Sequence, residues 1–233
     1  MYDPIKLSKQ TESIVLKGNM KKYYRFRPTG FYGGIATADT VGCNLRCKFC
    51  WSSNSVWNTK NVGKFYSPDD VADILCSIAS KKGYNQLRIS GGEPTIGRIH
   101  LITLLENIDS KYLFILETNG ILLGEDITYV EELSKFKNIH VRVCFKGCNS
   151  EEFSMLTGAE KGFDYQIKSL GYLKDKKMRF NIALVSIKKD KKQFYDKLTE
   201  MDLDKIMIED EEIKLYPLVR KRLYDEGILH LFE

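Results

Sequence analysis

The strongest constraint on the fold is the regular alternation of short apolar runs with longer stretches whose apolar residues recur at helical spacing. The short runs have strand length and cover residues 35–40, 87–90, 112–117, 139–145, 180–185 and 212–216. The stretches between them predict helices near residues 68–82, 99–108, 129–136, 163–173 and 194–201. Strands that alternate with helices form parallel sheets with right-handed crossovers. Six such units in 233 residues predict an α/β fold, an open (βα)6 partial TIM barrel with a parallel sheet.

The helix after residue 67 carries the clearest boundary signals. Ser67 is a typical N-cap, Pro68 suits the first helical position, and Asp70 stands three residues after the cap. Gly83 follows two lysines and suits the C-cap. Cys76 falls inside this helix and is interpreted as a small apolar core residue.

Length and composition predict a single globular core. The chain has 43% hydrophobic and 29% charged residues, which is enough for one sizeable core in 233 residues. Residues 1–34 are interpreted as an N-terminal extension and residues 35–233 as the core domain. The first residues lack the apolar segment of a signal peptide, and no run is long enough for a membrane span. The six cysteines are therefore expected to stay reduced, in the cytoplasm.

The net charge of +5 neither requires nor excludes a nucleic-acid partner. Residues 21–27 mix basic and aromatic side chains, a composition that can stack on nucleobases. The same composition is typical of an edge strand or a packed flank, which is the favoured interpretation. A nucleic-acid partner is kept as an alternative.

Three cysteines, Cys43, Cys47 and Cys50, lie close together directly after the first predicted strand. Three thiolates can each bind one iron of a four-iron cluster, and the fourth iron then stays open to an outside ligand. The alternatives are a zinc knuckle and a redox pair formed by Cys47 and Cys50. Zinc prefers four ligands in pairs, and the other non-helical cysteines, Cys144 and Cys148, lie about a hundred residues away. The spacing favours a [4Fe–4S] cluster held by three cysteines.

Further motifs follow the ends of later predicted strands. Residues 91–94 (Gly-Gly-Glu-Pro) follow the second strand, residues 117–120 (Glu-Thr-Asn-Gly) end the third, and Lys146 follows the fourth. Two adjacent glycines let a backbone approach a ligand closely and offer it free N–H and C=O groups. Because the carboxyl ends of parallel strands meet at one rim, we expect these motifs to converge with the cysteines.

The cysteine spacing, the aromatic Phe49 before the last cysteine, and the Gly-Gly-Glu-Pro motif resemble the radical S-adenosylmethionine (SAM) superfamily. The resemblance extends over residues 35–217. It implies that the open iron binds the amine and carboxylate of SAM. It also implies that the reduced cluster cleaves SAM to a 5′-deoxyadenosyl radical. The Gly-Gly-Glu-Pro motif would then contact SAM, and Phe49 would lie near its adenine.

Within the superfamily, the chain most resembles the glycyl-radical-enzyme activases, which are similar to pyruvate formate-lyase activating enzyme. Residues 117–120 correspond to their Asp-Thr-Asn-Gly segment, and Lys146 corresponds to the lysine of their Asp-x-Lys element. Cys144 replaces the aspartate of that element, and Val219 stands where the activases have a histidine. The resemblance implies that the acid of the first segment and Lys146 contact SAM.

These observations predict a small radical SAM enzyme of the oxidoreductase or activase type, with one [4Fe–4S] cluster and SAM as cofactors. The favoured substrate is a protein glycyl residue in a glycyl-radical enzyme, and the expected electron donor is a flavodoxin or ferredoxin. The alternatives are a radical SAM enzyme that modifies a nucleoside precursor or RNA, and a non-catalytic iron–sulfur or zinc protein. Cys144 and Cys148 are interpreted as incidental. The candidate site comprises Cys43, Cys47 and Cys50 as catalytic cluster ligands, and Phe49, Gly91, Gly92, Glu93, Pro94, Glu117, Asn119 and Lys146 as SAM-binding residues.

Overall fold

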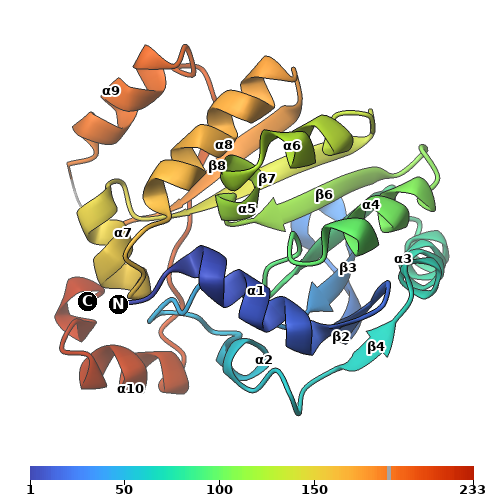
Figure 1. Ribbon diagram of the computed structural model, residues 1–233, viewed down its shortest axis with the longest axis horizontal. Coiled ribbons are helices and arrows are strands. Elements are labelled where there is room, and N and C mark those ends of the chain that lie inside the picture. The colour runs from blue at the N-terminus through green and yellow to red at the C-terminus, as the bar shows by residue number, and fades with distance from the viewer. Residues whose placement is uncertain (188–189) are drawn as a thin grey trace.

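The computed structural model describes residues 1–187 and 190–233, and its strands form one mixed sheet with helices packed against it (Figure 1). Six neighbouring strands run parallel, in the order β3 (Ile35–Thr40), β5 (Gln86–Gly91), β6 (Leu113–Thr118), β7 (Ile139–Lys146), β8 (Arg179–Val185) and β9 (Ile208–Asp210). Each of them pairs in parallel with the next. The structure confirms the predicted α/β fold, with the six parallel strands of an open partial TIM barrel.

The last parallel strand lies earlier in the chain than predicted. β9 is Ile208–Asp210, so the prediction of a strand over residues 212–216 is wrong. The N–H of Glu211 still donates to the carbonyl of Leu184 at 2.9 Å, and the chain then leaves the sheet. Residues 212–216 alternate between exposed and half-buried side chains. An extended segment lying on the surface gives that alternation without pairing to a strand, which explains the error.

Helices cover the outer side of the sheet at or near the predicted positions, namely α3 (Pro68–Lys82), α4 (Arg98–Glu106), α6 (Ile127–Leu133), α8 (Phe163–Asp175) and α9 (Lys192–Glu200). Ser67 and Asp70 cap the start of α3 with reciprocal hydrogen bonds, and Gly83 ends it with a φ of 67°. The apolar faces of these helices and of the sheet form one continuous core. Among the described residues, no helix has both the length and the apolar character needed to cross a membrane.

Several short elements were not expected from the sequence. They are α2 (Ser53–Trp57), α5 (Ile121–Glu125), α7 (Ser150–Thr157), α10 (Pro217–Asp225), and the 3-10 turns η1 (Phe31–Gly33) and η2 (Leu229–Leu231). Most of these helices are shorter than three turns, so they carry too few apolar positions for the helical period to be recognised.

Residues 1–34 add an antiparallel edge to the sheet. α1 (Pro4–Val15) leads into β1 (Leu16–Lys17) and β2 (Met20–Thr29), and β2 pairs antiparallel with β1, β3 and β4 (Lys64–Tyr66). The basic and aromatic run over residues 21–27 forms most of β2. Because β2 pairs on both sides and Lys21, Lys22 and Tyr23 are buried, the run is a packed flank and not an edge strand. The domain boundary after residue 34 stays a prediction.

The sheet face turned away from the helices carries charged side chains. Arg88 of β5 forms an ion pair with Glu117 of β6 at 3.1 Å, and Arg142 of β7 pairs with Glu209 of β9 at 2.8 Å. Different strands of the sheet thus contribute opposite charges to the barrel interior, which pairs these groups within the protein. The polar interior leads directly to the rim where the predicted motifs end.

Candidate active site

The carboxyl ends of the parallel strands surround a cavity of about 400 Å³. Every predicted site residue except Pro94 lines it, so the structure brings together Cys43, Cys47, Phe49, Cys50, Gly91, Gly92, Glu93, Glu117, Asn119 and Lys146. The cavity is also lined by Trp51, Arg142, Cys144, Glu211 and Lys214. The strand-end argument therefore places the motifs correctly, while their individual roles stay predictions.

The cysteine loop is held by segments far away in the sequence. The Tyr2 hydroxyl accepts a hydrogen bond from the Arg46 N–H at 2.6 Å. The Lys48 N–H donates to the carbonyl of Leu156, at the end of α7, at 2.9 Å. These contacts fix the loop through its main chain and leave its thiols directed to the cavity.

All three thiols of the loop are free. Burial raises the pKa of Cys47 to about 12, and burial also raises the pKa of Cys43 and of Cys50. Buried thiols lose their protons when they bind a metal centre, because the metal stabilises the thiolate. The Leu45 N–H lies 3.3 Å from Cys43 Sγ, and N–H groups of this kind tune the potential of iron–sulfur clusters. The donor set therefore fits a [4Fe–4S] cluster.

A buried amide beside Cys43 supports the same fit. Asn44 Oδ1 accepts a hydrogen bond from Asn119 Nδ2 at 2.7 Å, and Asn44 Nδ2 has no hydrogen-bond partner among the described residues. A buried donor without an acceptor is costly, and a cluster sulfide or thiolate would supply one. In the described part of the chain, no group of His, Cys, Asp or Glu is arranged to hold a single metal ion. A four-iron cluster does not need its ligands to converge on one ion, because each thiolate binds a separate iron.

The Gly-Gly-Glu-Pro loop packs against the cysteine loop through its backbone. The Gly92 N–H donates to the carbonyl of Thr40 at 2.9 Å, and the Glu93 N–H donates to that of Gly42 at 2.7 Å. A Cβ atom at position 92 would lie 1.9 Å from the Gly42 oxygen. Glycine is therefore required because two loops touch here. The expectation that both glycines offer free N–H groups to a ligand is wrong for Gly92.

The buried Glu93 carboxylate joins the loops after β5 and β6. Its Oε1 accepts hydrogen bonds from the Thr95 N–H at 3.0 Å, the Thr95 hydroxyl at 2.6 Å and the Thr118 hydroxyl at 2.7 Å. Its Oε2 accepts from the Asn119 N–H at 2.8 Å. A carboxylate has about four acceptor sites, so most of its capacity is used within the protein. Glu93 thus positions the rim.

Lys21 supports the Gly-Gly-Glu-Pro loop from behind, a role that the sequence reasoning missed. Its side chain is fully buried, and Nζ donates to the carbonyls of Glu93 at 3.2 Å, Pro94 at 2.7 Å and Ile96 at 2.5 Å. Burial lowers the pKa of Lys21 to about 7, against the opposing effect of the Glu93 charge. These contacts place Pro94 behind the cavity wall. The sequence contained one indication of this burial. Lys21 lies two residues before Tyr23, so on a strand the two side chains lie on the same face.

Glu117 lines the cavity, but its carboxylate already has partners on β5. Arg88 Nη1 donates to it at 3.1 Å and the Ser90 hydroxyl at 2.6 Å. A contact of Glu117 with SAM would compete with these bonds. Asn119, two residues further, faces the cysteine loop, and its Nδ2 lies 3.9 Å from Cys43 Sγ.

Lys146 and Phe49 lie together on the cavity wall. Lys146 Nζ is 5.8 Å from the centroid of the Phe49 ring and 3.6 Å from Glu211 Oε2. Burial lowers the pKa of Lys146, but the negative charge of Glu211 opposes burial, and the pKa lies above its ordinary value. Lys146 is therefore a fixed positive charge, which suits a carboxylate ligand.

Charged residues opposite the cysteine loop also escaped prediction. Arg142 donates to Glu211 at 2.8 Å, and to Glu209 through two nitrogens at 3.0 and 2.8 Å. Cys144 Sγ lies 3.5 Å from Arg142 Nη1. The available signal was the strand period, because Arg142, Cys144 and Lys146 alternate along β7 and so face the same side of the sheet.

Comparison with known proteins assigns the family. The family model described as the Radical SAM superfamily matches residues 38–198, which is most of the chain. The protein therefore belongs to the radical SAM superfamily, as its motifs predict. The cofactors of this family are a [4Fe–4S] cluster and SAM, and both fit the donor groups found in the cavity.

Curated relatives match part of the chain. The GTP 3′,8-cyclase of Aquifex aeolicus is 28% identical over 106 residues, which is 45% of this chain and 32% of the relative. The GTP 3′,8-cyclase of Clostridium perfringens is 31% identical over 120 residues, which is 51% of this chain and 36% of the relative. The chain thus spans about a third of the length of these relatives. Their names are those of nucleotide cyclases and lend no support to the activase branch.

Solved structures share the fold. Streptococcus suis SuiB bound to precursor peptide SuiA has a TM-score of 0.61 at 22% identity, covering 82% of this chain and 45% of SuiB. TYW1 with a lysine–pyruvate adduct bound has a TM-score of 0.53 at 14% identity, covering 82% of this chain and 71% of TYW1. At these identities the similarity concerns the fold alone.

Proposed function

We propose that the protein uses this cavity to form a 5′-deoxyadenosyl radical from SAM and to remove a hydrogen atom from a bound substrate. The observation that carries the proposal is the composition of one cavity wall. Three free thiols of a single loop, the Gly-Gly-Glu-Pro loop and the Phe49–Lys146 pair all face the same space. When bound, the reduced cluster supplies the electron that breaks SAM, and the chain supplies binding, orientation and exclusion of water.

The residues of the cavity would divide this work. The cysteine thiolates would each hold one iron, with the free Asn44 amide donating toward the cluster. Lys146 would bind the SAM carboxylate as a point charge, and Phe49 would face the adenine. Lys146 could then leave Glu211 and bind SAM. Glu211 would still be paired, because it keeps its 2.8 Å hydrogen bond from Arg142.

For the substrate we favour a segment of a polypeptide. The cationic side chains that line the cavity, Arg142, Lys146 and Lys214, each form an ion pair with a glutamate in the described structure. A polyphosphate needs several uncompensated cations, so this cavity suits a substrate of lower charge. At its mouth, Trp51 and Tyr216 are exposed, with ring centroids 5.9 Å apart. Exposed Trp and Tyr are typical anchors of protein contacts.

A glycyl residue of a glycyl-radical enzyme is the narrower form of this hypothesis. Its support is the resemblance of residues 117–120 and Lys146 to the activase elements. A flavodoxin or ferredoxin is proposed as the electron donor. The cytoplasm is proposed as the location, because all six cysteines are free.

Modification of a nucleotide is the second candidate, and the names of the curated relatives favour it. Binding of RNA through residues 21–27 has less support. Lys22 donates to main-chain carbonyls at 2.8 and 2.9 Å, and Arg25 and Arg27 both pair with the buried Asp39. These charges are engaged within the protein. A non-catalytic iron–sulfur or zinc protein is the least favoured alternative, because the family match extends over residues 38–198, which contain the cysteine loop, the Gly-Gly-Glu-Pro motif and Lys146.

An anaerobic assay tests the proposed chemistry. The protein is reconstituted with iron and sulfide, reduced with dithionite and given SAM, and 5′-deoxyadenosine is measured. We expect product from the wild type and none from Cys47→Ala, whereas Cys76→Ala, a helix cysteine outside the cavity, serves as the matched control. Absence of product from a fully reconstituted wild type would contradict the proposal.

A deuterium-transfer experiment separates the two substrate classes. The assay is repeated with peptide and nucleotide fractions from cells grown on deuterated medium. If a polypeptide is the substrate, the 5′-deoxyadenosine gains deuterium only with the peptide fraction. Deuterium gained only with the nucleotide fraction would overturn the polypeptide hypothesis and support the second candidate.

A further inference from the structure

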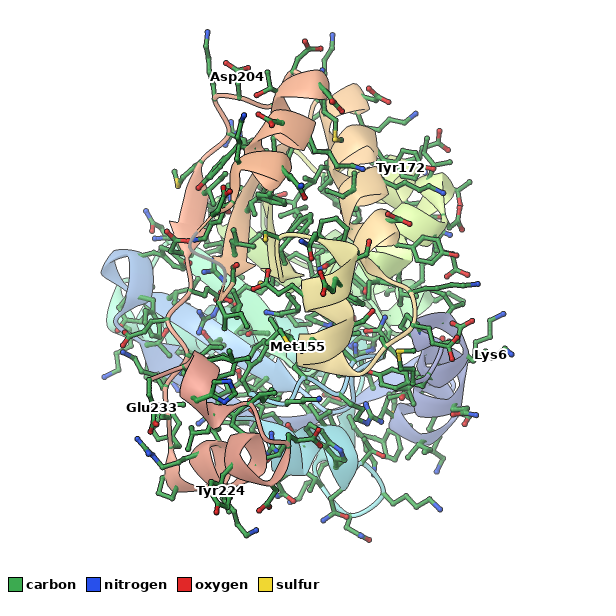
Figure 2. The ribbon with its side chains drawn as sticks, turned by 90° about the vertical axis from the view of Figure 1, so that its left-hand side faces the viewer. Lys6, Met155, Tyr172, Asp204, Tyr224 and Glu233 are labelled. Atoms are coloured by element: carbon green, nitrogen blue, oxygen red, sulfur yellow. The ribbon has the colours of Figure 1, made fainter. Side chains whose placement is uncertain are left out.

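The C-terminal part of the chain crosses the mouth of the open barrel. After β9, residues 211–214 line the cavity, and the chain continues into α10 (Pro217–Asp225). Figure 2 shows α10 at one edge of the molecule, with Tyr224 directed away from the body. Val219 and Leu223 on the opposite face of α10 are buried. The segment thus begins at the end of β9 and reaches the cysteine loop, which follows β3.

Arg222 of α10 makes the central contact with the cysteine loop. Its Nη1 donates to the carbonyl of Lys48 at 3.0 Å and to the carbonyl of Cys50 at 3.0 Å. Glu226, just after α10, forms an ion pair with the Lys48 ammonium at 2.9 Å. One side chain of the C-terminal helix therefore satisfies the main chain of two residues at the end of the cysteine motif.

A shared aromatic ring adds a second link. The guanidinium carbon of Arg222 lies 4.9 Å from the centroid of the Trp57 ring, and that of Arg46 lies 5.7 Å from the same centroid. Trp57 ends α2, and Arg46 belongs to the cysteine loop. Cation–π contacts of two arginines with one ring tie α10, α2 and the cysteine loop together.

We propose that Arg222 is a positioning residue for Cys50 and that α10 is a clasp that keeps the cysteine loop in its cluster-binding shape. The two carbonyl bonds fix the peptide plane before Phe49 and the peptide plane after Cys50, which limits the direction of the Cys50 side chain. The ion pair and the Trp57 contacts hold Arg222 in the orientation that makes both bonds. This inference rests on the proposed role of Cys50 as a cluster ligand.

Hydrogen–deuterium exchange of the metal-free protein tests the clasp without any cluster chemistry. Arg222→Met removes the donors and keeps a long apolar side chain. We expect the amides of residues 44–52 to exchange about tenfold faster in this variant, as expected when a charged hydrogen bond is lost. Arg220→Met is the matched control, because Arg220 is exposed on the same helix and pairs with Glu233. Unchanged exchange in Arg222→Met would overturn the inference.

Iron retention gives a second readout. After reconstitution, a chelator should remove iron about tenfold faster from Arg222→Met than from Arg220→Met. Arg222→Lys should restore most of the retention, because an ammonium can donate to two carbonyls at once, as Lys21 does. Equal iron loss from all variants would contradict the clasp. If the wild type binds no cluster, the proposed function fails, and the exchange measurement still decides whether the clasp exists.

Discussion

The two halves of the cavity rim are held by different kinds of contact. The cysteine half consists of the loops after β3, β5 and β6. Main-chain hydrogen bonds join the first two loops, as between Gly92 and Thr40, and the buried Glu93 carboxylate joins the loops after β5 and β6. The charged half consists of Arg142, Cys144, Lys146, Glu209 and Glu211, and side-chain ion pairs join its parts. Both halves line the cavity, and the first half also rests on the buried Lys21.

This difference determines which half of the rim tolerates amino-acid substitutions. A rim built from main-chain contacts tolerates few substitutions, because an added atom meets backbone that cannot move aside. A rim built from side-chain ion pairs can change its charges and keep its fold when both partners of a pair change together. We therefore infer that the cysteine half holds the cluster, whereas the charged half contributes Lys146 to SAM binding and uses its other charged side chains to select the substrate.

The largest expected effect is that of Gly92→Ala in the cysteine half. The new Cβ would lie 1.9 Å from the Gly42 oxygen, so the two loops must separate. We expect a loss of more than about 3 kcal/mol of folding free energy, together with loss of cluster loading. Denaturant unfolding and iron content measure both. Gly30→Ala is the control, since nothing lies within 4 Å of its Cβ position. Normal iron content in Gly92→Ala would contradict the main-chain view of this half.

The next effect is that of Lys21→Met, which leaves three carbonyls behind the Gly-Gly-Glu-Pro loop without their donor. We expect a loss of about 3 kcal/mol of folding free energy and a weaker response to SAM. Lys22→Met is a matched comparison, because Lys22 is also buried and donates to the carbonyls of Thr59 and Lys60. Both variants should lose stability, and only Lys21→Met should lose SAM affinity. Equal SAM affinity in the two variants would show that Lys21 has no special relation to the rim.

In the charged half, Lys146→Met should change function and spare the fold. Glu211 keeps Arg142 as a partner, so we expect less than about 1 kcal/mol of lost stability. The SAM concentration needed for half-maximal 5′-deoxyadenosine formation should rise about tenfold. Lys176→Met, at a surface lysine paired with Glu131, controls for the loss of a charge. An unchanged SAM requirement would remove Lys146 from the binding site.

The smallest effect is expected for Cys144→Ser. Cys144 lines the cavity, but it belongs to β7 and not to the cysteine loop. We expect unchanged iron content per chain, whereas Cys50→Ser should lose most of its iron. Elemental analysis after reconstitution and desalting separates the two cases. A large loss of iron in Cys144→Ser would mean that the cluster has a fourth protein ligand and would erase the distinction between the halves.

The fold could be predicted because its signals are local. Ser67, Asp70 and Gly83 mark the ends of one helix, and apolar runs mark all the parallel strands but the last. The last strand was misplaced because residues 212–216 alternate in burial without pairing. The short helices α2, α7 and α10 were missed because each carries too few apolar positions to show the helical period. Contacts with the folded chain, such as the bond from the Lys48 N–H to the Leu156 carbonyl of α7, help to fix their positions.

The site could be predicted only where a motif fixes the backbone. Residues 43–50 and 91–94 have spacings that few other structures require, so they were found. The roles of Lys21 and Arg222 depend on carbonyls more than seventy residues away in the sequence, and no spacing reveals such contacts. Arg142 and Glu211 form part of the cavity through ion pairs between strands, which also require the folded chain.

The electron paramagnetic resonance spectrum of the reduced, reconstituted protein tests the central claim most directly. The claim is that three thiolates of the cysteine half leave one iron open and that SAM binds there. We predict the signal of a reduced [4Fe–4S] cluster in the absence of SAM, and a clear change of that signal when SAM is added. The signal should be absent from Cys47→Ala. A wild-type cluster whose spectrum ignores SAM, or no cluster at all, would contradict the claim.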